Sequence, residues 1–262
     1  MRTIESAVSR PRWERRKDAR PNELMAAALD LFVAQGYAGT RLDDVAAHAG
    51  VSKGTLYLYF DTKEALFKAV VRENIVRSLL QARALAERYP GRTDALLHEL
   101  IHSWWRNVGD TQASGIVKLM MAESGNFPEI ARFYFDEVIQ PAHEMIEHVI
   151  ERGIRRGEFR PVAVGSYMRV MVAPIVMLML WRHSFGPCCN DSINVPEYLQ
   201  ALIDMSLAGL RPPPRVVQQG RTAKTRAVPS IAARARAVTA VPSVTKRTKR
   251  GAKRTPASGR DW

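Results

Sequence analysis

One segment of the sequence has the spacing of a catalytic zinc site. His98, Glu99 and His102 form an H-E-x-x-H pattern, which on a helix places two imidazoles on one face and adds a carboxylate as general base. Hydrolysis would also need a third zinc ligand and a substrate cleft. The longer form of the motif fails, because Trp105 stands at its glycine position. We therefore predict no metal site, no cofactor and no enzymatic activity, and interpret the segment as an ordinary helix.

A second group of residues is suited to binding a polyanion. In the stretch from Ser52 to Lys63, Leu56 and Phe60 are spaced i,i+4 and are expected to pack inward. The other side chains supply a cation, hydroxyls and aromatic edges, which can reach phosphate oxygens, base edges and thymine methyls. These outward residues are Lys53, Gly54, Thr55, Tyr57 and Tyr59. Lys63 adds charge to the first turn of the next helix, where free N–H groups suit phosphate.

The elements that must position these residues are helices. Apolar residues recur at the helical period almost throughout, which predicts an all-α fold. Thr40, with Asp43 three residues on, is expected to cap the second helix, Ser52 the third, and Asp61 or Thr62 the fourth. The expected helices span residues 22–35, 40–49, 52–60, 63–88, 94–107, 112–124, 128–156, 162–183 and 195–209.

The second and third expected helices are short and are joined by a glycine turn at Gly50-Val51. This arrangement predicts a helix-turn-helix whose second helix enters the major groove of DNA. Helix–glycine–helix stretches also occur in helical proteins that bind no DNA, and tyrosines often only pack. The pattern by itself therefore leaves a plain helical core as the alternative.

Residues 28–71 resemble the DNA-binding domain of the TetR family of transcriptional regulators. The matching residues are Phe32, Gly36-Tyr37, Thr40, Val45-Ala46, Ala49-Gly50-Val51-Ser52, Thr55-Leu56-Tyr57, Tyr59-Phe60 and Lys63-Glu64-Ala65-Leu66. The resemblance implies an all-α homodimer that reads a pseudo-palindromic double-stranded operator and binds a small-molecule inducer. It further implies phosphate contacts at Thr40 and Lys63. Recognition-helix contacts are implied at Lys53, Gly54, Thr55, Tyr57 and Tyr59.

The resemblance weakens after about residue 75, and residues 115–160 look like an AefR-type variant of the regulatory domain. Apolar side chains in this region are candidates for the lining of a ligand pocket, although the same residues could simply fill a core. They are Trp104, Trp105, Met120, Met121, Phe133, Phe135 and Met145. By family analogy, the last two helices pair with their symmetry mates. The stripes assigned to this pairing are Met168, Val172, Ile175 and Met179, and Leu199, Leu202, Ile203 and Met205 to Leu207.

Charge and composition divide the chain of 262 residues. Residues 1–20 carry a net charge of +4, residues 21–210 of −4, and residues 211–262 of +13. We predict a basic N-terminal arm at 1–20, a helix-turn-helix domain at 21–67 and a ligand-binding and dimerisation domain at 68–210. The Lys/Arg/Pro/Ala-rich tail at 211–262 is expected to be disordered and to add phosphate contacts without sequence information.

The cellular setting follows from cysteine use and from the apolar runs. The two cysteines, Cys188 and Cys189, are adjacent and form no disulfide framework, which indicates a reducing cytoplasm. The longest apolar run, Met168 to Trp181, has 14 residues and contains Arg169 and Pro174, too short for a membrane span. We expect a cytoplasmic, nucleoid-associated protein with no membrane partner.

Three functions compete at this point. The first is a repressor released from its operator by a small molecule. The second is an architectural DNA binder dominated by the basic tail, with no inducer. The third is an enzyme built on His98 and His102. We favour the ligand-responsive repressor.

Overall fold

The computed structural model describes residues 12–189 and 193–213, with side chains from Arg20 onward, and these ranges contain helices and no strand. The helices are α1 (Arg12–Gly39), α2 (Leu42–His48), α3 (Lys53–Tyr57), α4 (Lys63–Val71), η1 (Arg72–Val76), α5 (Arg77–Arg88), α6 (Thr93–Trp104), η2 (Trp105–Gly109), α7 (Ser114–Glu123), α8 (Pro128–Tyr134), η3 (Phe135–Ile139), α9 (Gln140–Arg155), α10 (Val164–Ser184) and α11 (Val195–Leu210). The all-α prediction is confirmed. Residues 1–11 of the arm predicted at 1–20, and residues 214–262 of the predicted tail, lie outside the described residues.

Three of the predicted long helices are single continuous segments that each contain a π-helical turn. The turns are η1, η2 and η3, and they lie within residues 63–88, 93–109 and 128–155. A π turn accommodates one extra residue per turn and frequently occurs at functional sites. Hydrophobic periodicity predicted the helices but not these turns, because one widened turn shifts the period too little to be seen.

The beginning and the end of α1 differ from the prediction. The helix begins at Arg12, ten residues before the predicted start at Asn22, so it extends into the segment assigned to the basic arm. Its regular part ends where predicted, because Gly36 has φ 78° and ψ 173°. A positive φ of this size is a conformation that glycine adopts without the steric cost borne by other residues.

The capping predictions hold for two helices and fail for one. The side chain of Ser52 accepts a hydrogen bond from Thr55 N, and that of Thr62 accepts one from Ala65 N. Thr40 does not cap α2, whose N-cap is Arg41 and lacks a side-chain cap. The Thr40 hydroxyl instead donates to Gly36 O at 2.7 Å, because the chain turns back on itself after Gly36.

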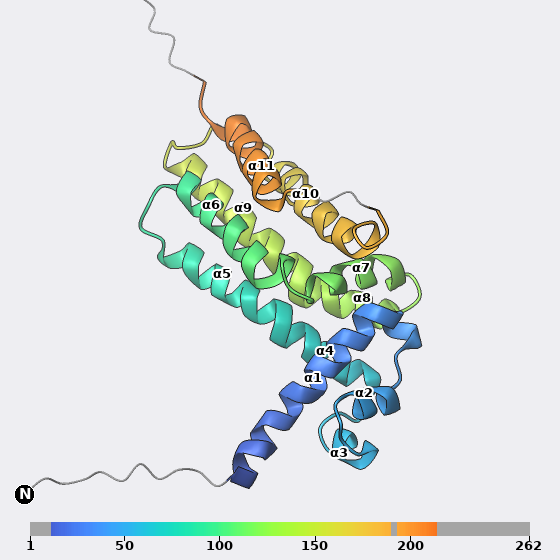
Figure 1. Cartoon of the computed structure of the whole chain (residues 1–262). Coiled ribbons are helices and arrows are strands. Elements are labelled where there is room, and N and C mark those ends of the chain that lie inside the picture. The colour runs from blue at the N-terminus through green and yellow to red at the C-terminus, as the bar shows by residue number, and fades with distance from the viewer. Residues whose placement is uncertain (1–11, 190–192, 214–262) are drawn as a thin grey trace, which may run out of the picture. The chain divides into compact units, whose positions relative to one another are not determined.

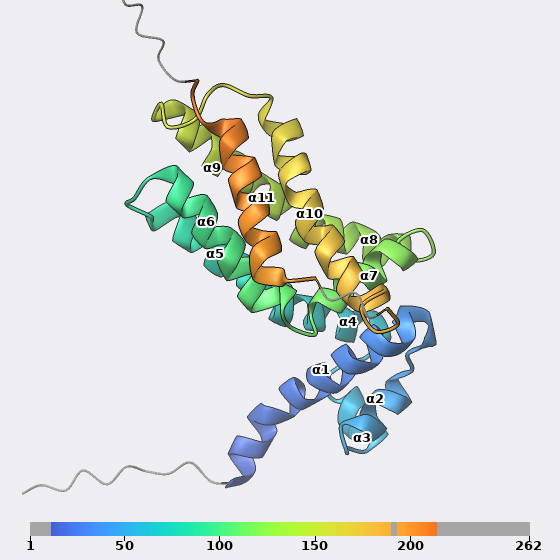
Figure 2. The same ribbon diagram turned by 45° about the horizontal axis from the view of Figure 1, so that its top comes forward.

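Figures 1 and 2 show α1, α2 and α3 grouped together, with α4 leading from this group into a bundle made by α5 to α11. One hydrophobic core runs through both parts, because α1 packs against α4 and α7. In this core Phe32 of α1 meets the ring of Phe67 of α4 edge to face at 5.2 Å. A second core cluster lies within the bundle between α5, α6, α9 and the first half of α10.

The stripes predicted to pair between two chains face inward instead. Met168, Met179 and Leu202 are almost completely buried within the chain, as are most of the other assigned residues. Of the assigned residues only Met205 on α11 is exposed, and α10 carries its exposed apolar side chains Val170 and Met177 outside the assigned stripe. The helical period was read correctly, but a helix that is apolar on two faces does not reveal which face its own core takes.

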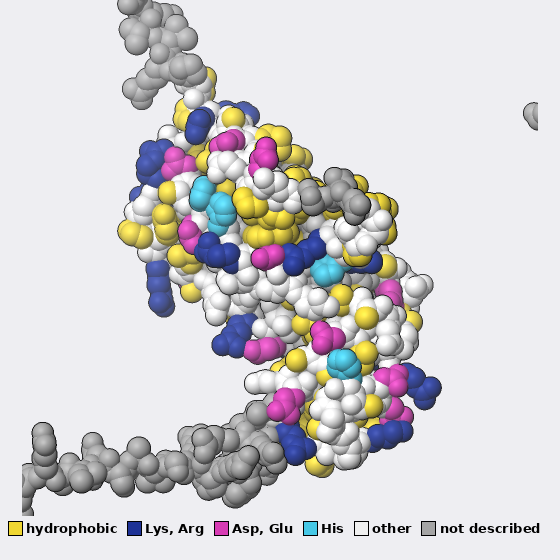
Figure 3. All heavy atoms as spheres, viewed as in Figure 1, with side chains coloured by type: hydrophobic (Ala, Val, Ile, Leu, Met, Phe, Trp, Pro, Cys, Tyr) yellow, Lys and Arg dark blue, Asp and Glu magenta, His cyan; other side chains and the backbone are white. Residues whose placement is uncertain are grey.

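Among the described helices, only α10 is long and apolar enough to cross a membrane by length and composition. Only 22% of its most apolar window is buried within the chain, so much of its apolar surface is uncovered. Figure 3 shows hydrophobic side chains gathered where α10 and α11 lie in this view.

Three histidines should make the fold sensitive to acid. Burial is the main cause that lowers the pKa of His102, His143 and His183. His183 Nε2 also lies 2.7 Å from the Ser114 hydroxyl and so joins α10 to α7. The unfolded chain, whose histidines titrate near the ordinary value of about 6.5, therefore takes up protons at a higher pH than the folded chain does.

We expect the free energy of unfolding to fall as the pH drops from 7.5 to 5.5, with stability fully present above about pH 6.5. Urea titrations at both pH values measure this change. His183→Gln should show a shallower decline, and the exposed His148→Gln serves as the matched control. Equal stability of the wild-type chain at both pH values would contradict the expectation.

Candidate nucleic-acid interface and ligand cavity

The short helix α3 is built to present one face to solvent. Its first turn is fixed by Ser52, whose Oγ accepts from Thr55 N at 3.2 Å and lies 2.9 Å from Thr55 Oγ1. Leu56 points inward and is completely buried. The rest of the helix is thereby held on a rigid scaffold with its other faces outward, as recognition of DNA requires.

The predicted recognition residues are gathered on this outer face to different degrees. Lys53, Gly54 and Tyr57 are exposed, whereas Thr55 and Tyr59 are half-buried. The ammonium of Lys53 forms an ion pair with Asp43 of α2 at 2.5 Å. The ammonium has three N–H donors and the side chain is exposed, so Lys53 can reach a phosphate with or without keeping this ion pair.

Leu58 is the exposed residue that the sequence analysis missed. It follows the last residue of α3, and 82% of its surface is exposed, more than for the neighbouring Tyr57 at 48%. An exposed leucine beside cationic and aromatic side chains can contact thymine methyl groups in the major groove. The sequence contained a signal for it, because Leu58 does not belong to the inward pair Leu56 and Phe60 and is an apolar residue next to the outward Tyr57 and Tyr59.

The two residues expected to contact phosphate are used inside the protein. Thr40 is 1% exposed, and its hydroxyl is engaged with Gly36. Lys63 Nζ donates to Tyr37 O at 2.8 Å and to Ala38 O at 3.3 Å, and lies 4.5 Å from the centre of the Tyr37 ring. Burial is the main cause that lowers the pKa of Lys63. Both residues support the turn after α1, and phosphate contact by either remains a prediction.

This turn is also held from the other side by the bundle. The carboxylate of Glu123, the last residue of α7, accepts from Tyr37 N at 2.8 Å and from Ala38 N at 3.1 Å. A Cβ at position 36 would overlap the same carboxylate, so Gly36 is needed both for its positive φ and for this close approach. We call the set formed by Gly36, Tyr37, Ala38, Lys63 and Glu123 the α1 clamp. In it, amides face Glu123 and carbonyls face Lys63.

Aromatic packing makes the clamp rigid. The ring of Tyr37 meets Phe127 edge to face at 4.9 Å and Phe67 at 5.4 Å. Burial raises the pKa of Tyr37 to about 12, with the nearby carboxylates of Glu64, Glu129 and Glu123 adding to the shift. The sequence held no signal for the Glu123 contact, because the two segments lie 86 residues apart.

A second tie joins the same two regions. Arg72 of η1 makes a bidentate contact with Glu137 of η3, with Nε at 2.8 Å from Oε2 and Nη2 at 2.5 Å from Oε1. The hydrogen bond is the main cause that lowers the pKa of Glu137. Lys68 and Arg72 also lie over the ring of Phe133. The helix that leaves the DNA-reading group is therefore fastened to the wall of the bundle.

Inside the bundle lies a cavity of about 410 Å³. Its walls come from α5, α6, α7, α8, η3, α9 and α10, and no Lys, Arg, Asp or Glu is among the lining residues. Trp104, Met120, Met121 and Met145 of the predicted pocket residues line it. The volume and the apolar walls are typical of small-molecule sites.

The other three predicted pocket residues lie elsewhere, which corrects the assignment. Trp105 is buried in the core, with its ring packed where a side chain on Gly109 would be. Phe133 faces the cations of the helix from α4 to η1, and Phe135 is half-exposed. Adjacent residues on a helix point in directions about 100° apart, and here Trp104 lies toward the cavity whereas Trp105 lies toward the core.

His98 and His102 have their ring centres 4.4 Å apart on α6, and Glu99 pairs with Arg106 at 2.9 Å. The described residues contain no group of three or more side chains of the metal-ligating types placed to hold an ion. His98 is exposed, whereas Glu99 and His102 are half-buried. The interpretation of this segment as an ordinary helix stays a prediction.

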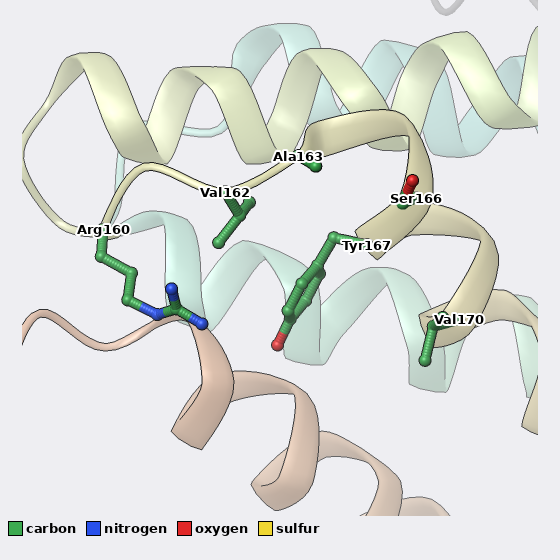
Figure 4. A pocket seen from close by; sticks show the side chains of 6 residues that line it. All are labelled: Arg160, Val162, Ala163, Ser166, Tyr167 and Val170. Carbon is green, nitrogen blue, oxygen red and sulfur yellow. The ribbon is translucent and has the colours of Figure 1, made fainter.

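A shallow hollow lies where α10 begins, lined by the residues labelled in Figure 4: Arg160, Val162, Ala163, Ser166, Tyr167 and Val170. Arg160 Nε donates to Gly209 O at 2.6 Å, and the Tyr167 hydroxyl donates to Ser206 O at 2.5 Å. These contacts fasten the beginning of α10 to the end of α11 and explain the hollow as a by-product of helix packing.

Comparison with known proteins assigns both parts of the chain. Residues 24–70 match the family described as bacterial regulatory proteins, tetR family, and residues 90–187 match the tetracyclin repressor-like C-terminal domain. Together the two ranges cover more than half of the chain. The chain belongs to the TetR family. It is a DNA-binding transcriptional regulator, and its sequence-based assignment is confirmed, while the AefR-type detail stays a prediction.

Relatives of this TetR-family chain include regulators from several bacteria. It is 29% identical over 148 residues to the uncharacterized HTH-type transcriptional regulator YfiR of Bacillus subtilis, covering 56% of this chain and 71% of YfiR. It is 25% identical over 200 residues to the HTH-type transcriptional repressor KstR2 of Rhodococcus jostii, covering 72% of this chain and 91% of KstR2.

Solved structures share the fold at low identity. The fatty acid degradation regulator FadR of Bacillus halodurans matches with a TM-score of 0.62 and 19% identity, covering 72% of this chain and 99% of that one. FadR of Bacillus subtilis in complex with stearoyl-CoA matches with a TM-score of 0.61 and 17% identity, again covering 72% and 99%. At these identities the likeness establishes the TetR fold alone.

Substitutions on α3 should separate reading of DNA from folding. We expect Tyr57→Ala to weaken operator binding by about 1–3 kcal/mol. We expect Leu58→Ala to weaken binding to operators that place a thymine methyl against this helix. Because the Leu58 side chain is exposed, the free energy of unfolding should stay within about 0.5 kcal/mol of wild type. Anisotropy titrations with an operator selected from random DNA measure both effects. Leu80→Ala, at another exposed leucine on α5, is the control. Wild-type affinity in both α3 variants would show that this face does not read DNA.

Proposed function

We propose that this TetR-family regulator is a homodimeric repressor that leaves its pseudo-palindromic operator when a small molecule fills the bundle cavity. The observation that carries the proposal is the double role of α7. Val117 and Met120 of this helix line the cavity, and Glu123 at its end holds the turn that supports the DNA-reading helices. A ligand that displaces α7 would therefore change the support of α3.

The close contact between α7 and α1 supports this coupling. Gly115 packs directly against Val33 of α1, and a side chain at position 115 would collide with it. Ser114 at the beginning of α7 is bound to His183 of α10. The helix is thus held at one end by the bundle and at the other by the α1 clamp. A displacement of α7 would therefore move the turn after α1.

The proposed dimer would use the exposed faces of α10 and α11. Val170, Ala173 and Met177 follow one another at helical spacing on α10 and are exposed, as are Ala201, Met205 and Ala208 on α11. Rows of small and flexible apolar side chains allow two helices to approach closely. One short recognition helix contacts too few base pairs to specify a site, so two copies at fixed spacing are needed.

We expect Met177→Asp to convert a dimer into a monomer at micromolar concentration, because it would place an unpaired charge in an apolar contact. Affinity for a full operator should fall, while the helical content is retained. Sedimentation velocity and circular dichroism measure both, and Leu80→Asp on α5 is the matched control. A Met177→Asp chain that remains dimeric would place the interface elsewhere.

Filling the cavity should imitate a ligand. Ala142 lines the cavity, so we expect Ala142→Phe to weaken operator binding by about 5- to 150-fold, the usual range of allosteric coupling. The same substitution in a Glu123→Ala background should have a smaller effect, because the clamp no longer transmits the shift. Ala95→Phe on the exposed side of α6 is the control. If folded Ala142→Phe binds the operator as wild type does, the cavity does not control DNA binding.

The division into functional regions remains part of the proposal. The expected boundary between 67 and 68 lies within the continuous helical segment from α4 to α5, so the two regions are joined by a helix and a shared core. The basic arm and tail would add salt-dependent phosphate contacts to the acidic body. We expect the protein to act in the cytoplasm on nucleoid DNA.

A further inference from the structure

We infer that the cavity selects an uncharged, elongated apolar ligand that presents a hydrogen-bond acceptor to the hydroxyl of Tyr134. This inference rests on the proposed function and names the ligand class for the same site. It depends on three observations: the chemistry of the walls, a tyrosine in the cavity wall whose hydroxyl has no hydrogen bond among the described residues, and the extent of the wall along one helical segment.

The walls offer nothing that would stabilise a charge. Four of the side chains that line the cavity carry a nitrogen or oxygen that can form a hydrogen bond, and none of these groups is a carboxylate, an ammonium or a guanidinium. They belong to Trp104, Ser124, Tyr134 and His143. Burial, assisted by the nearby Arg169, lowers the pKa of His143, so its imidazole is neutral at neutral pH. A carboxylate or phosphate in this cavity would lose its water without gaining a counter-ion, which is strongly unfavourable.

Tyr134 supplies the polar contact. It is 7% exposed and lines the cavity, and no hydrogen bond to its hydroxyl exists among the described residues. Burial alone raises its pKa, so the hydroxyl is a neutral donor. The fully buried atoms without a partner among the described residues are Thr93 Oγ1 and Trp181 Nε1, so the Tyr134 hydroxyl is not sealed off and remains accessible. A ligand acceptor in the cavity would give this donor a direct partner. Tyr167, in contrast, already donates to Ser206 O outside the cavity.

The polar groups also indicate the length of the ligand. Tyr134 and His143 lie nine residues apart on the continuous segment from α8 to α9, or about 13 Å along the helix axis. Between them the walls are formed by Val138, Ile139 and Ala142. The lining on this segment runs from Ala131 to Ile146, so the cavity extends along it and favours a ligand with an extended apolar part.

Two ten-carbon probes test the charge preference. At pH 8, 2-decanone is neutral with one acceptor, whereas decanoate is ionised. We expect 2-decanone to bind at least about 10-fold more tightly than decanoate to the full-length dimer, as measured by calorimetry and by the rise in melting temperature. Equal binding of the two probes, tighter binding of decanoate, or no binding of 2-decanone would overturn the inference.

Tyr134→Phe tests the role of the hydroxyl. We expect this variant to bind 2-decanone about 2- to 10-fold more weakly and to bind 1-decene, which lacks the acceptor, as wild type does. Tyr167→Phe is the matched control and should leave both affinities unchanged. Wild-type affinity of Tyr134→Phe for 2-decanone would overturn the role of Tyr134. The comparison of probes on the wild-type chain stands even if the variant does not fold.

Operator release is measured separately with the same probes. If 2-decanone binds with the expected preference but leaves operator affinity unchanged, the ligand class stands and the proposed release mechanism fails. If 2-decanone releases DNA and decanoate does so equally well, the release mechanism stands and the ligand class fails.

Discussion

The structure depends on the turn that ends α1. Gly36 takes a positive φ, and the two peptide groups after it are held by opposite charges, with their amides on Glu123 and their carbonyls on Lys63. Charge-assisted hydrogen bonds of this kind are stronger than neutral ones, and here they act on backbone that is partly screened from water. The turn fixes where α2 begins, so the orientation of α3 relative to the bundle follows from a few atoms of two side chains.

This turn also explains why the chain has one core rather than two. Tyr37 carries an aromatic group from the end of α1 into contact with both α4 and the segment before α8. The DNA-reading helices are too short to bury a large core of their own, and they share that of the bundle. A shared core transmits displacement, whereas two independent cores joined by a flexible linker would not.

Most helices could be predicted from the sequence, because apolar periodicity and glycine breaks are local signals. The caps at Ser52 and Thr62 were predictable for the same reason. The sequence did not show which face of an apolar helix packs against the core of its own chain. Met168 and Leu202 carry the right period but turn to the core of their own chain, and Trp105 points away from the cavity that its neighbour Trp104 lines. The Glu123 contact and the isolated hydroxyl of Tyr134 arise only when distant segments meet, so no pattern within a short window could reveal them.

The π turns carry a consequence for how such a protein can diverge. Removing one residue from η1 would convert the wide turn into a regular α turn, and because the wide turn already absorbs that residue, α5 would keep nearly the same orientation relative to α4. Leu79 and Ala82 would stay in the cavity wall, and every residue before Arg72 would keep its place. The same deletion in a regular turn would instead rotate every residue after it by about 100° relative to the residues before it. The three π turns are therefore positions at which related chains can gain or lose a residue while keeping both the cavity wall and the DNA-reading helices.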